Sequence, residues 1–208
     1  MPSTPKRTSR PTAHQDRKAG RQRAILSAAV RAFSELGYHG CTVSRIAREA
    51  GVADGTLYLY FRGKEDLLVS SFEHVLEEML AEMDRRTGAA PDAEQKLRAA
   101  TECHFEFLEN DPHLARFLQF QLRQPDDAIR KAIATPLGRY ARRIEAIIDQ
   151  GKGAGTFRDG IATSVLRRVY FGAVDETISA WLLRSDGTSL KARAEPVLDV
   201  LLNGMRTR

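Results

Sequence analysis

The sequence predicts an all-α protein with a small three-helix head at its N-terminal end and a larger helical body. Apolar residues recur at intervals of three and four over most of the chain, and few stretches alternate as strands do. Capping residues, glycines and prolines divide these stretches into segments of helical length. In residues 42–64, a cap, a turn and two apolar anchors together predict two short helices joined by a glycine turn, the helix-turn-helix unit.

Length and composition limit what the chain can be. Its 208 residues can form one ordinary domain, or a small head on a larger body. Such a chain buries roughly 70% of its unfolded surface, so it needs no metal or disulfide for stability. Cys41 and Cys103 lie far apart and fit no metal-ligand spacing, so we expect reduced thiols. With no membrane-spanning apolar run and no signal-peptide pattern, we expect a soluble, cytoplasmic protein without a membrane partner.

The N-terminal segment is strongly basic. Residues 1–23 contain seven Lys and Arg residues, three prolines and a single acid, Asp16, in a chain whose net charge is +5. Because the segment lacks apolar periodicity, we expect a disordered basic arm over residues 1–19. Such an arm can follow the backbone of DNA or enter its minor groove. The alternative is a solubilising tail that contacts nothing.

The first predicted helix runs from Arg21 to Leu36. Its apolar stripe consists of Ile25, Ala28, Ala29, Ala32, Phe33 and Leu36. Gly37 is expected to stop the helix. This helix should pack behind the helix-turn-helix unit and present Arg21 and Arg23, near its positive N-terminal end, towards phosphate.

The helix-turn-helix unit covers about residues 43–62. The buried face of its first helix is expected to be Val43, Ile46, Ala47 and Ala50. Thr42 can cap this helix, and Gly51 can adopt the positive φ that ends it. Asp54 is predicted to be the second N-cap. The second helix is anchored by two apolar residues one turn apart, Leu57 and Phe61.

The surface of this unit has the chemistry that DNA recognition requires. Hydroxyl groups of Thr56, Tyr58 and Tyr60 can reach phosphates and base edges. Positive charge is supplied around them by Arg45, Arg48, Arg62 and Lys64. We therefore expect DNA contacts from Thr42, Val43, Arg45, Ala53, Asp54, Gly55, Thr56, Tyr58, Tyr60 and Lys64. The alternative is an ordinary helical hairpin with a basic surface.

From residue 21 to about residue 80, the chain resembles the DNA-binding head of the TetR family of bacterial transcriptional regulators. The resemblance rests on Ala32, Phe33, Gly37, Tyr38, Thr42, Ile46, Ala47, Gly51, Thr56, Leu57, Tyr58, Tyr60, Phe61, Lys64 and Leu67. It implies a regulator that binds double-stranded operator DNA. A dimer would place two reading helices one DNA turn apart on a palindrome.

We assign residues 20–80 to the head and residues 81–208 to an effector-binding and dimerisation body. A long helix that begins at Gly63 and Lys64 belongs to both parts, so it could carry a ligand signal between them. Its inward face is expected to be Leu67, Leu68, Ser71, Phe72, Val75, Leu76, Met79, Leu80 and Met83. A loop is expected over residues 87–92, where the composition changes most clearly.

Later helices are predicted over residues 93–109, 111–123, 126–150, 163–183 and 190–205. Asp111 can cap the second of these, with Pro112 at its first position. Gly151, Gly153 and Gly155 are expected to form a flexible turn, and Asp186-Gly187 another. Pro196 is costly inside a helix, so the last helix either kinks there or begins near Glu195.

The last two helices carry more apolar surface than a small body needs. At spacings of three and four, a surface with small residues suited to close helix approach is formed by Val165, Val169, Gly172, Glu176 and Ser179. The family resemblance implies a four-helix interface between two subunits here, and therefore a homodimer. The alternative is a core helix of a monomer.

Enzymatic chemistry is not indicated. Glu102, Cys103 and His104 are neighbours in sequence and point in different directions on a helix, so they form no catalytic set. The glycines of residues 151–155 lack the lysine and the strand of a phosphate-binding loop, and no zinc spacing occurs. We expect no enzyme activity, no metal and no cofactor.

The body also resembles the FadR-type repressors of fatty acid degradation within the TetR family. The segments of the body concerned are NDPHLARFLQFQLRQ, GTFRDG and YFGAVDETISAWLL. The head segment GVADGTLYLYFRGKEDLL is also typical of this subgroup. This resemblance implies a repressor of fatty acid degradation genes that long-chain acyl-CoA releases from its operator. The alternative is a TetR-family repressor that responds to another hydrophobic or drug-like ligand.

An acyl-CoA site needs an apolar tunnel with a basic mouth. Arginines and lysines that could supply the mouth are Arg116, Arg123, Arg130, Lys131, Arg139, Arg142 and Arg143. The predicted ligand-binding residues are Met79, His104, Phe107, Phe117, Phe120, Gln121, Arg123, Arg139, Arg143, Phe171 and Asp175. Ordinary core packing is the alternative for each aromatic residue, and a solvated helix face is the alternative for the arginines.

Overall fold

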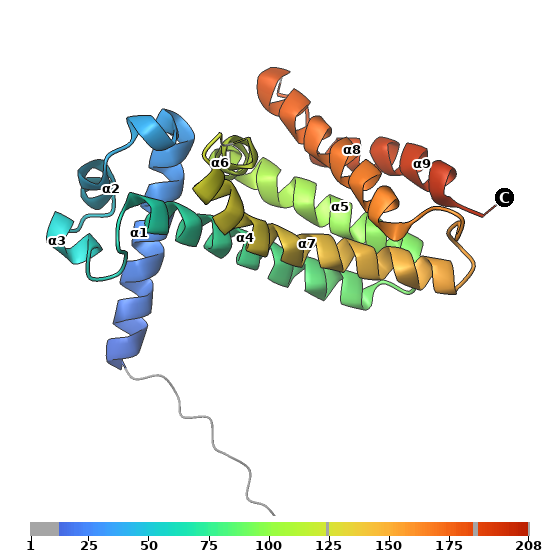
Figure 1. The fold of residues 1–208 in the computed structure, drawn as a ribbon, viewed down its shortest axis with the longest axis horizontal. Helices are drawn as coiled ribbons and strands as arrows, with labels where there is room; N and C mark the ends of the chain where they lie inside the picture. Colours follow the sequence, from blue (N-terminus) through green and yellow to red (C-terminus); the bar gives the residue numbers. More distant parts are fainter. Residues whose placement is uncertain (1–12, 124, 185–186, 208) are drawn as a thin grey trace, which may run out of the picture.

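The computed structural model describes residues 13–123, 125–184 and 187–207, and the regular structure of these residues is helical (Figure 1). Extended pairing among them is limited to one isolated antiparallel β-bridge between Phe157 and Arg206. The all-α prediction is therefore confirmed. Residues 1–12 of the predicted arm and Asp186 of the predicted turn lie outside the described residues.

Helix α1 (Ala13–Gly40) begins earlier than predicted, because residues 13–19 are helical rather than disordered. A helix extends at little cost once its nucleus exists, so the packed part of α1 can propagate into a basic segment that lacks apolar periodicity. The predicted stripe is buried from Ile25 to Phe33, whereas Leu36 is 43% exposed. Gly37 breaks the helical backbone with φ at 67°.

Helices α2 (Val43–Glu49) and α3 (Asp54–Leu57) form the helix-turn-helix unit beside α1. Helix α3 is a single turn, shorter than the second helix predicted from the sequence. Leu57 and Phe61 are both buried, so the segment after α3 is also held against the head.

Helix α4 (Lys64–Ala89) runs from the head along the whole body (Figure 1). All nine residues of its predicted inward face are buried. The helix continues through Thr87, so the predicted loop is shortened to residues 90–92. One continuous element therefore connects the DNA-binding head with the interior of the body.

Three further helices follow α4 in the body: α5 (Ala93–Asn110), α6 (Pro112–Leu122) and α7 (Asp127–Gly153). Each is capped by an aspartate whose carboxylate accepts a backbone N–H bond, namely Asp92, Asp111 and Asp126. Helix α7 continues through Gly151 and Gly153, so the predicted glycine turn is confined to Gly155, where φ is 72°.

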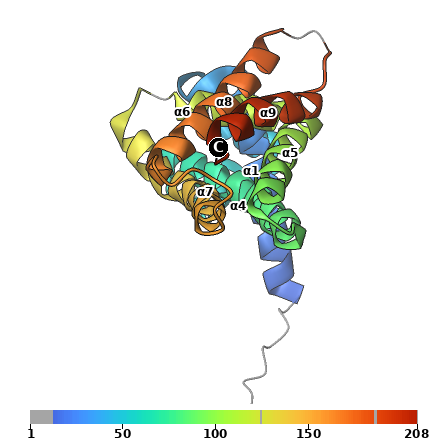
Figure 2. The same ribbon diagram turned by 90° about the vertical axis from the view of Figure 1, so that its right-hand side faces the viewer.

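Helices α8 (Thr163–Arg184) and α9 (Ala194–Met205) form the remaining layer of the body. Seen from the end of the molecule, α8 lies over α7 and α9 lies over α5 (Figure 2). A short 3₁₀ helix (Lys191–Arg193) precedes α9. Pro196 therefore occupies the first turn of α9, where proline is tolerated. Among the described residues, no helix has the length and apolarity to cross a membrane.

Candidate functional site

The helix-turn-helix unit is fixed by short-range hydrogen bonds. Thr42 Oγ1 accepts the backbone N–H of Arg45 at 3.2 Å, and Gly51 has φ at 66°, as predicted. The prediction for Asp54 is wrong, because Ala53 occupies the N-cap position and Asp54 is the first helical residue. The Asp54 carboxylate instead accepts a hydrogen bond from the Ser44 hydroxyl of α2. This bond ties the second helix to the first.

The ten residues predicted to contact DNA all retain exposed surface. Tyr58 is 55% exposed, above the buried Leu57. Exposed alongside Tyr58 are Thr42, Ala53, Asp54 and Gly55. The partly exposed members of the set are Val43, Arg45, Thr56, Tyr60 and Lys64. Leu59, which was not among the ten predicted residues, is 79% exposed on the same segment.

Two of the predicted cations are already engaged within the head. The Lys64 ammonium lies 4.6 Å from the centroid of the Tyr38 ring and 3.4 Å from the His39 carbonyl oxygen. It therefore fastens the start of α4 to the end of α1. The Arg45 guanidinium is paired with Glu49 of the same helix, which limits its freedom to reach a phosphate.

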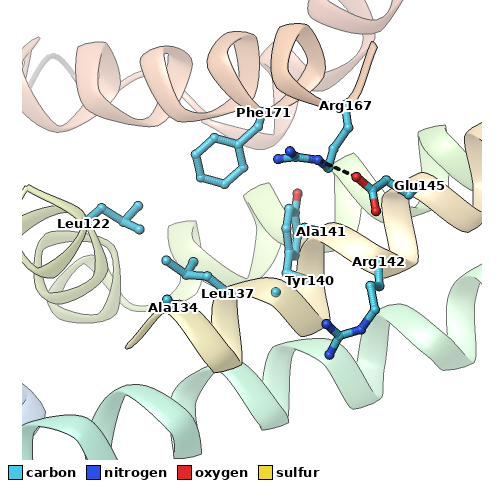
Figure 3. Close-up of a pocket in the computed structure, with 10 residues that line it drawn as sticks. Leu122, Ala134, Leu137, Tyr140, Ala141, Arg142, Glu145, Arg167 and Phe171 are labelled. Carbon is cyan, nitrogen blue, oxygen red and sulfur yellow. Dashed lines mark hydrogen bonds and ion pairs between the residues drawn. The ribbon is translucent and has the colours of Figure 1, made fainter. Parts of the chain in front are cut away.

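A cleft of about 490 Å³ opens between α6, α7 and α8 (Figure 3). Its wall is mostly apolar and consists of Leu122, Ala134, Leu137, Gly138, Tyr140, Ala141, Arg142, Glu145, Arg167 and Phe171. Phe171 projects from α8 towards Leu137 and Tyr140 of α7 (Figure 3). Side chains from three helices thus converge on one opening.

Behind this cleft lies an inner space of only about 30 Å³. It is lined from five helices by Phe72, Leu76, Met79, His104, Leu118, Gln119, Leu122, Leu137, Tyr140, Phe171, Val174, Asp175 and Ile178. Four residues line both spaces and form the neck between them: Leu122, Leu137, Tyr140 and Phe171. The inner space has about the volume that one water molecule occupies in the liquid. A larger ligand can enter only if the surrounding side chains move.

Buried polar groups meet at the floor of the inner space. His104 Nδ1 and Tyr140 Oη lie 3.2 Å apart, and Thr101 Oγ1 and Tyr170 Oη lie 2.9 Å apart. Burial lowers the pKa of His104 to about 4, although the nearby Asp175 carboxylate acts in the opposite direction. Burial also raises the pKa of Tyr140 well above its usual value. These groups are therefore neutral at pH 7, so the part of the floor that His104 and Tyr140 form carries no charge.

Asp175 lies in a polar cluster between α6 and α8. Arg123 Nη2 is 3.0 Å from Asp175 Oδ2 and 3.0 Å from Ser179 Oγ, and Gln119 Nε2 donates to Asp175 Oδ1 at 2.9 Å. The charge of Arg123 is therefore largely balanced by the protein's own carboxylate. Gln119 and Asp175 of this cluster also line the inner space.

The basic rim of the cleft differs from the predicted one. Arg167 pairs with Glu145 at 2.8 Å, and Arg142 extends along the other edge (Figure 3). Arg139 and Arg143, which were predicted to bind ligand, lie away from the cleft and pair with acids of α4, at 3.4 Å to Glu77 and 2.6 Å to Asp84 respectively. Residues four apart share a helix face, so both arginines turn towards α4 together.

Four of the predicted ligand residues line the inner space: Met79, His104, Phe171 and Asp175. Phe107, Phe117, Phe120 and Gln121 line neither space. Phe117 is buried against α1 and α4, and Phe120 is 52% exposed. The prediction missed Leu137, Tyr140 and Arg167. Leu137 and Tyr140 are three residues apart on α7, a spacing that places both on one face of the helix.

Helix α6 also joins the cleft to the DNA-binding head. The Phe117 ring lies 6.3 Å from Phe33 of α1 and 6.4 Å from Phe72 of α4, measured between centroids. Ser34 Oγ donates to a backbone carbonyl of α1 at 2.8 Å, so the 3.0 Å contact with His113 Nδ1 requires the imidazole to donate. Helix α6 is therefore fixed to α1 by both apolar and polar contacts.

Together, the fold and its two sites define a class: all-helical regulatory proteins with a helix-turn-helix head and a body that contains a mostly apolar cleft. The family model "Bacterial regulatory proteins, tetR family" matches residues 25–70, and the model "YsiA-like protein, C-terminal region" matches residues 72–204. The chain belongs to the TetR family of bacterial regulatory proteins.

The relatives that are similar over most of the chain include regulators of fatty acid metabolism. The fatty acid metabolism regulator protein of Bacillus subtilis is 35% identical over 88% of this chain and 95% of its own length. The structure of the fatty acid degradation regulator FadR from Bacillus halodurans has a TM-score of 0.85 and 36% identity, over 88% of this chain and 99% of that one. The structure of FadR from Bacillus subtilis in complex with stearoyl-CoA has a TM-score of 0.85 and 35% identity, over 88% and 98%. The predicted resemblance to FadR-type regulators is confirmed.

Proposed function

We propose that this protein is a DNA-binding repressor of fatty acid degradation genes and that long-chain acyl-CoA releases it from its operator. The observation that carries the proposal is the neck. Its four residues connect a cleft with cations on its rim to an apolar inner space, so a hydrocarbon chain entering between α7 and α8 would be led towards α4. The stearoyl-CoA bound to the similar FadR of Bacillus subtilis supports the same ligand class.

The two ends of an acyl-CoA match the two ends of this path. Burial of hydrocarbon contributes roughly 0.8 kcal/mol per methylene, so about twelve carbons contribute up to about 9 kcal/mol before entropy costs. Exposed ion pairs at the rim contribute about 0–1 kcal/mol each. The chain would therefore supply most of the affinity, while Arg142 and Arg167 would favour the CoA phosphates over a free fatty acid.

Ligand entry would reach the head by two routes. The inner space is lined by Phe72, Leu76 and Met79 of α4, whose first residue, Lys64, is fastened to α1. It is also lined by α6, which packs on α1 through Phe117. Opening this space would move both helices against the head. A coupling of 1–3 kcal/mol between the two sites is typical of such regulators and would suffice for release.

The active form would be a homodimer joined through α8 and α9. Apolar side chains exposed on these helices support this arrangement, including Val169 at 55%, Leu183 at 85% and Val200 at 73%. Gly172 and Glu176 are also exposed, whereas Ser179 faces the Arg123 cluster and would not belong to the interface. Val169→Arg should yield monomers in sedimentation experiments that also lose operator affinity.

Operator contacts would come from the ten residues of the helix-turn-helix surface. Tyr58→Ala should weaken binding to an operator selected from random DNA more than binding to unrelated DNA. Lys64→Ala should weaken binding to the operator and to unrelated DNA alike. It should also lower the slope of log K against log salt by the amount expected for about one phosphate contact. Equal effects of both substitutions on unrelated DNA would argue against α3 as the reading element.

The effector is tested by titrating a fluorescent operator complex with acyl-CoAs of increasing length, free fatty acids, free CoA and a cationic dye. Long-chain acyl-CoA should release the operator, and short acyl-CoA and free CoA should not. Arg167→Gln should raise the acyl-CoA concentration needed, whereas Arg85→Gln, the same change at the exposed far end of α4, should not. Release by the dye alone would identify a drug-responsive regulator. If free fatty acid and acyl-CoA release the operator equally well, the arginines at the rim do not contribute to ligand binding.

A further inference from the structure

The first three turns of α1 project beyond the folded core (Figure 1). Residues 16–24 are all exposed, and Ile25, which follows them, is buried. Tertiary packing normally supplies most of the stability of a helix, and this segment has almost none of its own. It is therefore a structured element whose surface is left for a partner.

The charge of this projecting segment is strongly one-sided. It carries Arg17, Lys18, Arg21 and Arg23 against a single acid, Asp16. The first three of these cations line a groove of about 600 Å³ whose opposite wall is formed by Leu59 and Tyr60. That wall is the segment directly after α3, so the groove lies next to the predicted reading surface.

We propose that this groove binds phosphates of the DNA backbone that flanks the base pairs read by α3. The inference rests on operator binding as proposed above and adds a second contact area to it. Positive charge on one wall complements a phosphate backbone. On the other wall, the exposed Leu59 and the tyrosine ring offer apolar surface to the sugars. The helical form matters because it fixes Lys18 and Arg21 at the edge of the groove.

The first test removes charge. Lys18→Gln with Arg21→Gln is compared with Arg85→Gln with Lys96→Gln, which removes the same charge at the far end of α4 and the start of α5. Each phosphate contact contributes about 0.9 to the slope of log K against log salt. Loss of two contacts should therefore reduce the effect of a fourfold salt increase about twelvefold for each protomer bound to the DNA. The far-end double variant should keep the wild-type slope.

The second test changes the DNA. Operator duplexes trimmed to the base pairs read by α3 are compared with duplexes extended by half a helical turn at each end. Wild type and the far-end variant should prefer the extended duplex, and the Lys18→Gln, Arg21→Gln variant should bind both lengths equally. The proposal that the groove binds phosphates is refuted if the wild-type protein binds both lengths equally and has the same salt slope as the Lys18→Gln, Arg21→Gln variant. A wild-type protein that binds no operator at all overturns the proposed function instead.

The third test changes conformation without changing charge. A Cβ at Gly20 would meet no atom within 4 Å, so Gly20→Ala should be accommodated and should stabilise the projecting helix. Gly20→Pro should interrupt it before the buried core begins. We expect Gly20→Pro to lose the preference for extended duplexes and Gly20→Ala to keep or increase it, with thermal unfolding of the core unchanged in both. Full preference in Gly20→Pro would refute a role for the helical projection.

Discussion

His104 should make the folded protein sensitive to mild acid. Its imidazole is buried at the floor of the inner space, 3.2 Å from Tyr140 Oη, and burial lowers its pKa from 6.5 to about 4. Between these two values the unfolded chain binds a proton that the folded chain excludes. The stability associated with neutral His104 is therefore complete above pH 6.5 and is lost as the pH falls towards 4.

The size of this effect follows from the shift. The value pH 5 lies about 1.5 units below the ordinary pKa of histidine. Each pH unit below that pKa lowers the free energy of unfolding by about 1.36 kcal/mol, so the protein should lose about 2 kcal/mol of stability at pH 5. Urea unfolding at pH 7.5 and pH 5, at one fixed protein concentration, measures the loss. His104→Gln is the control, because glutamine can still bond to Tyr140 and cannot take up the proton.

Other groups also titrate in this range, so the decisive quantity is the difference between wild type and variant. Wild type should lose about 2 kcal/mol more than His104→Gln between the two pH values. Equal losses in the two proteins would show that the imidazole is hydrated or paired with a charge, and the description of His104 and Tyr140 as an uncharged part of the pocket floor would be refuted.

Three further substitutions test other parts of the structure. Thr42→Ala removes the acceptor for the Arg45 N–H and should cost about 1 kcal/mol of unfolding free energy in urea. Gly151→Ala would bring its Cβ to 2.1 Å from a ring carbon of the buried Phe157, so it should cost about 1–3 kcal/mol by the same measurement. Leu137→Trp should fill the neck and keep about three methylenes of an acyl chain out of the interior. At roughly 0.8 kcal/mol for each methylene, palmitoyl-CoA should then bind about 50-fold more weakly, as measured by calorimetry. DNA binding by this last variant should stay unchanged, and an unaltered palmitoyl-CoA affinity would count against the neck as the path.

The fold could be predicted where a helix boundary has a local chemical cause. Thr42 and Asp111 cap their helices as predicted, and the first turn of the last helix accepts Pro196. The start of α1 could not be found in this way. Residues 13–19 lack apolar periodicity, and they are helical because they extend a helix that is stabilised further along the chain.

The candidate ligand site was less accessible from the sequence because helix rotation is set by packing between helices. Helix α6 has apolar residues on several faces, and the neighbouring α1 takes Phe117, which leaves Leu118 and Leu122 for the inner space. Helix α7 likewise turns Arg139 and Arg143 towards the acids of α4. Residue type indicated an apolar interior near cations, but only the three-dimensional arrangement distinguishes the cavity wall from the ordinary core.

The small volume of the inner space has a consequence for the sensitivity of the regulator. A ligand that must displace the protein's own side chains binds with an apparent affinity reduced by the fraction of molecules that are open. The concentration at which the protein responds is therefore set partly by how tightly residues such as Met79 and Ile178 pack against one another. Substitutions that loosen this packing would lower the response threshold, and ones that tighten it would raise it, without altering any group that touches the ligand's polar end. Evolution could then match such a regulator to different effector concentrations by changing ordinary core residues.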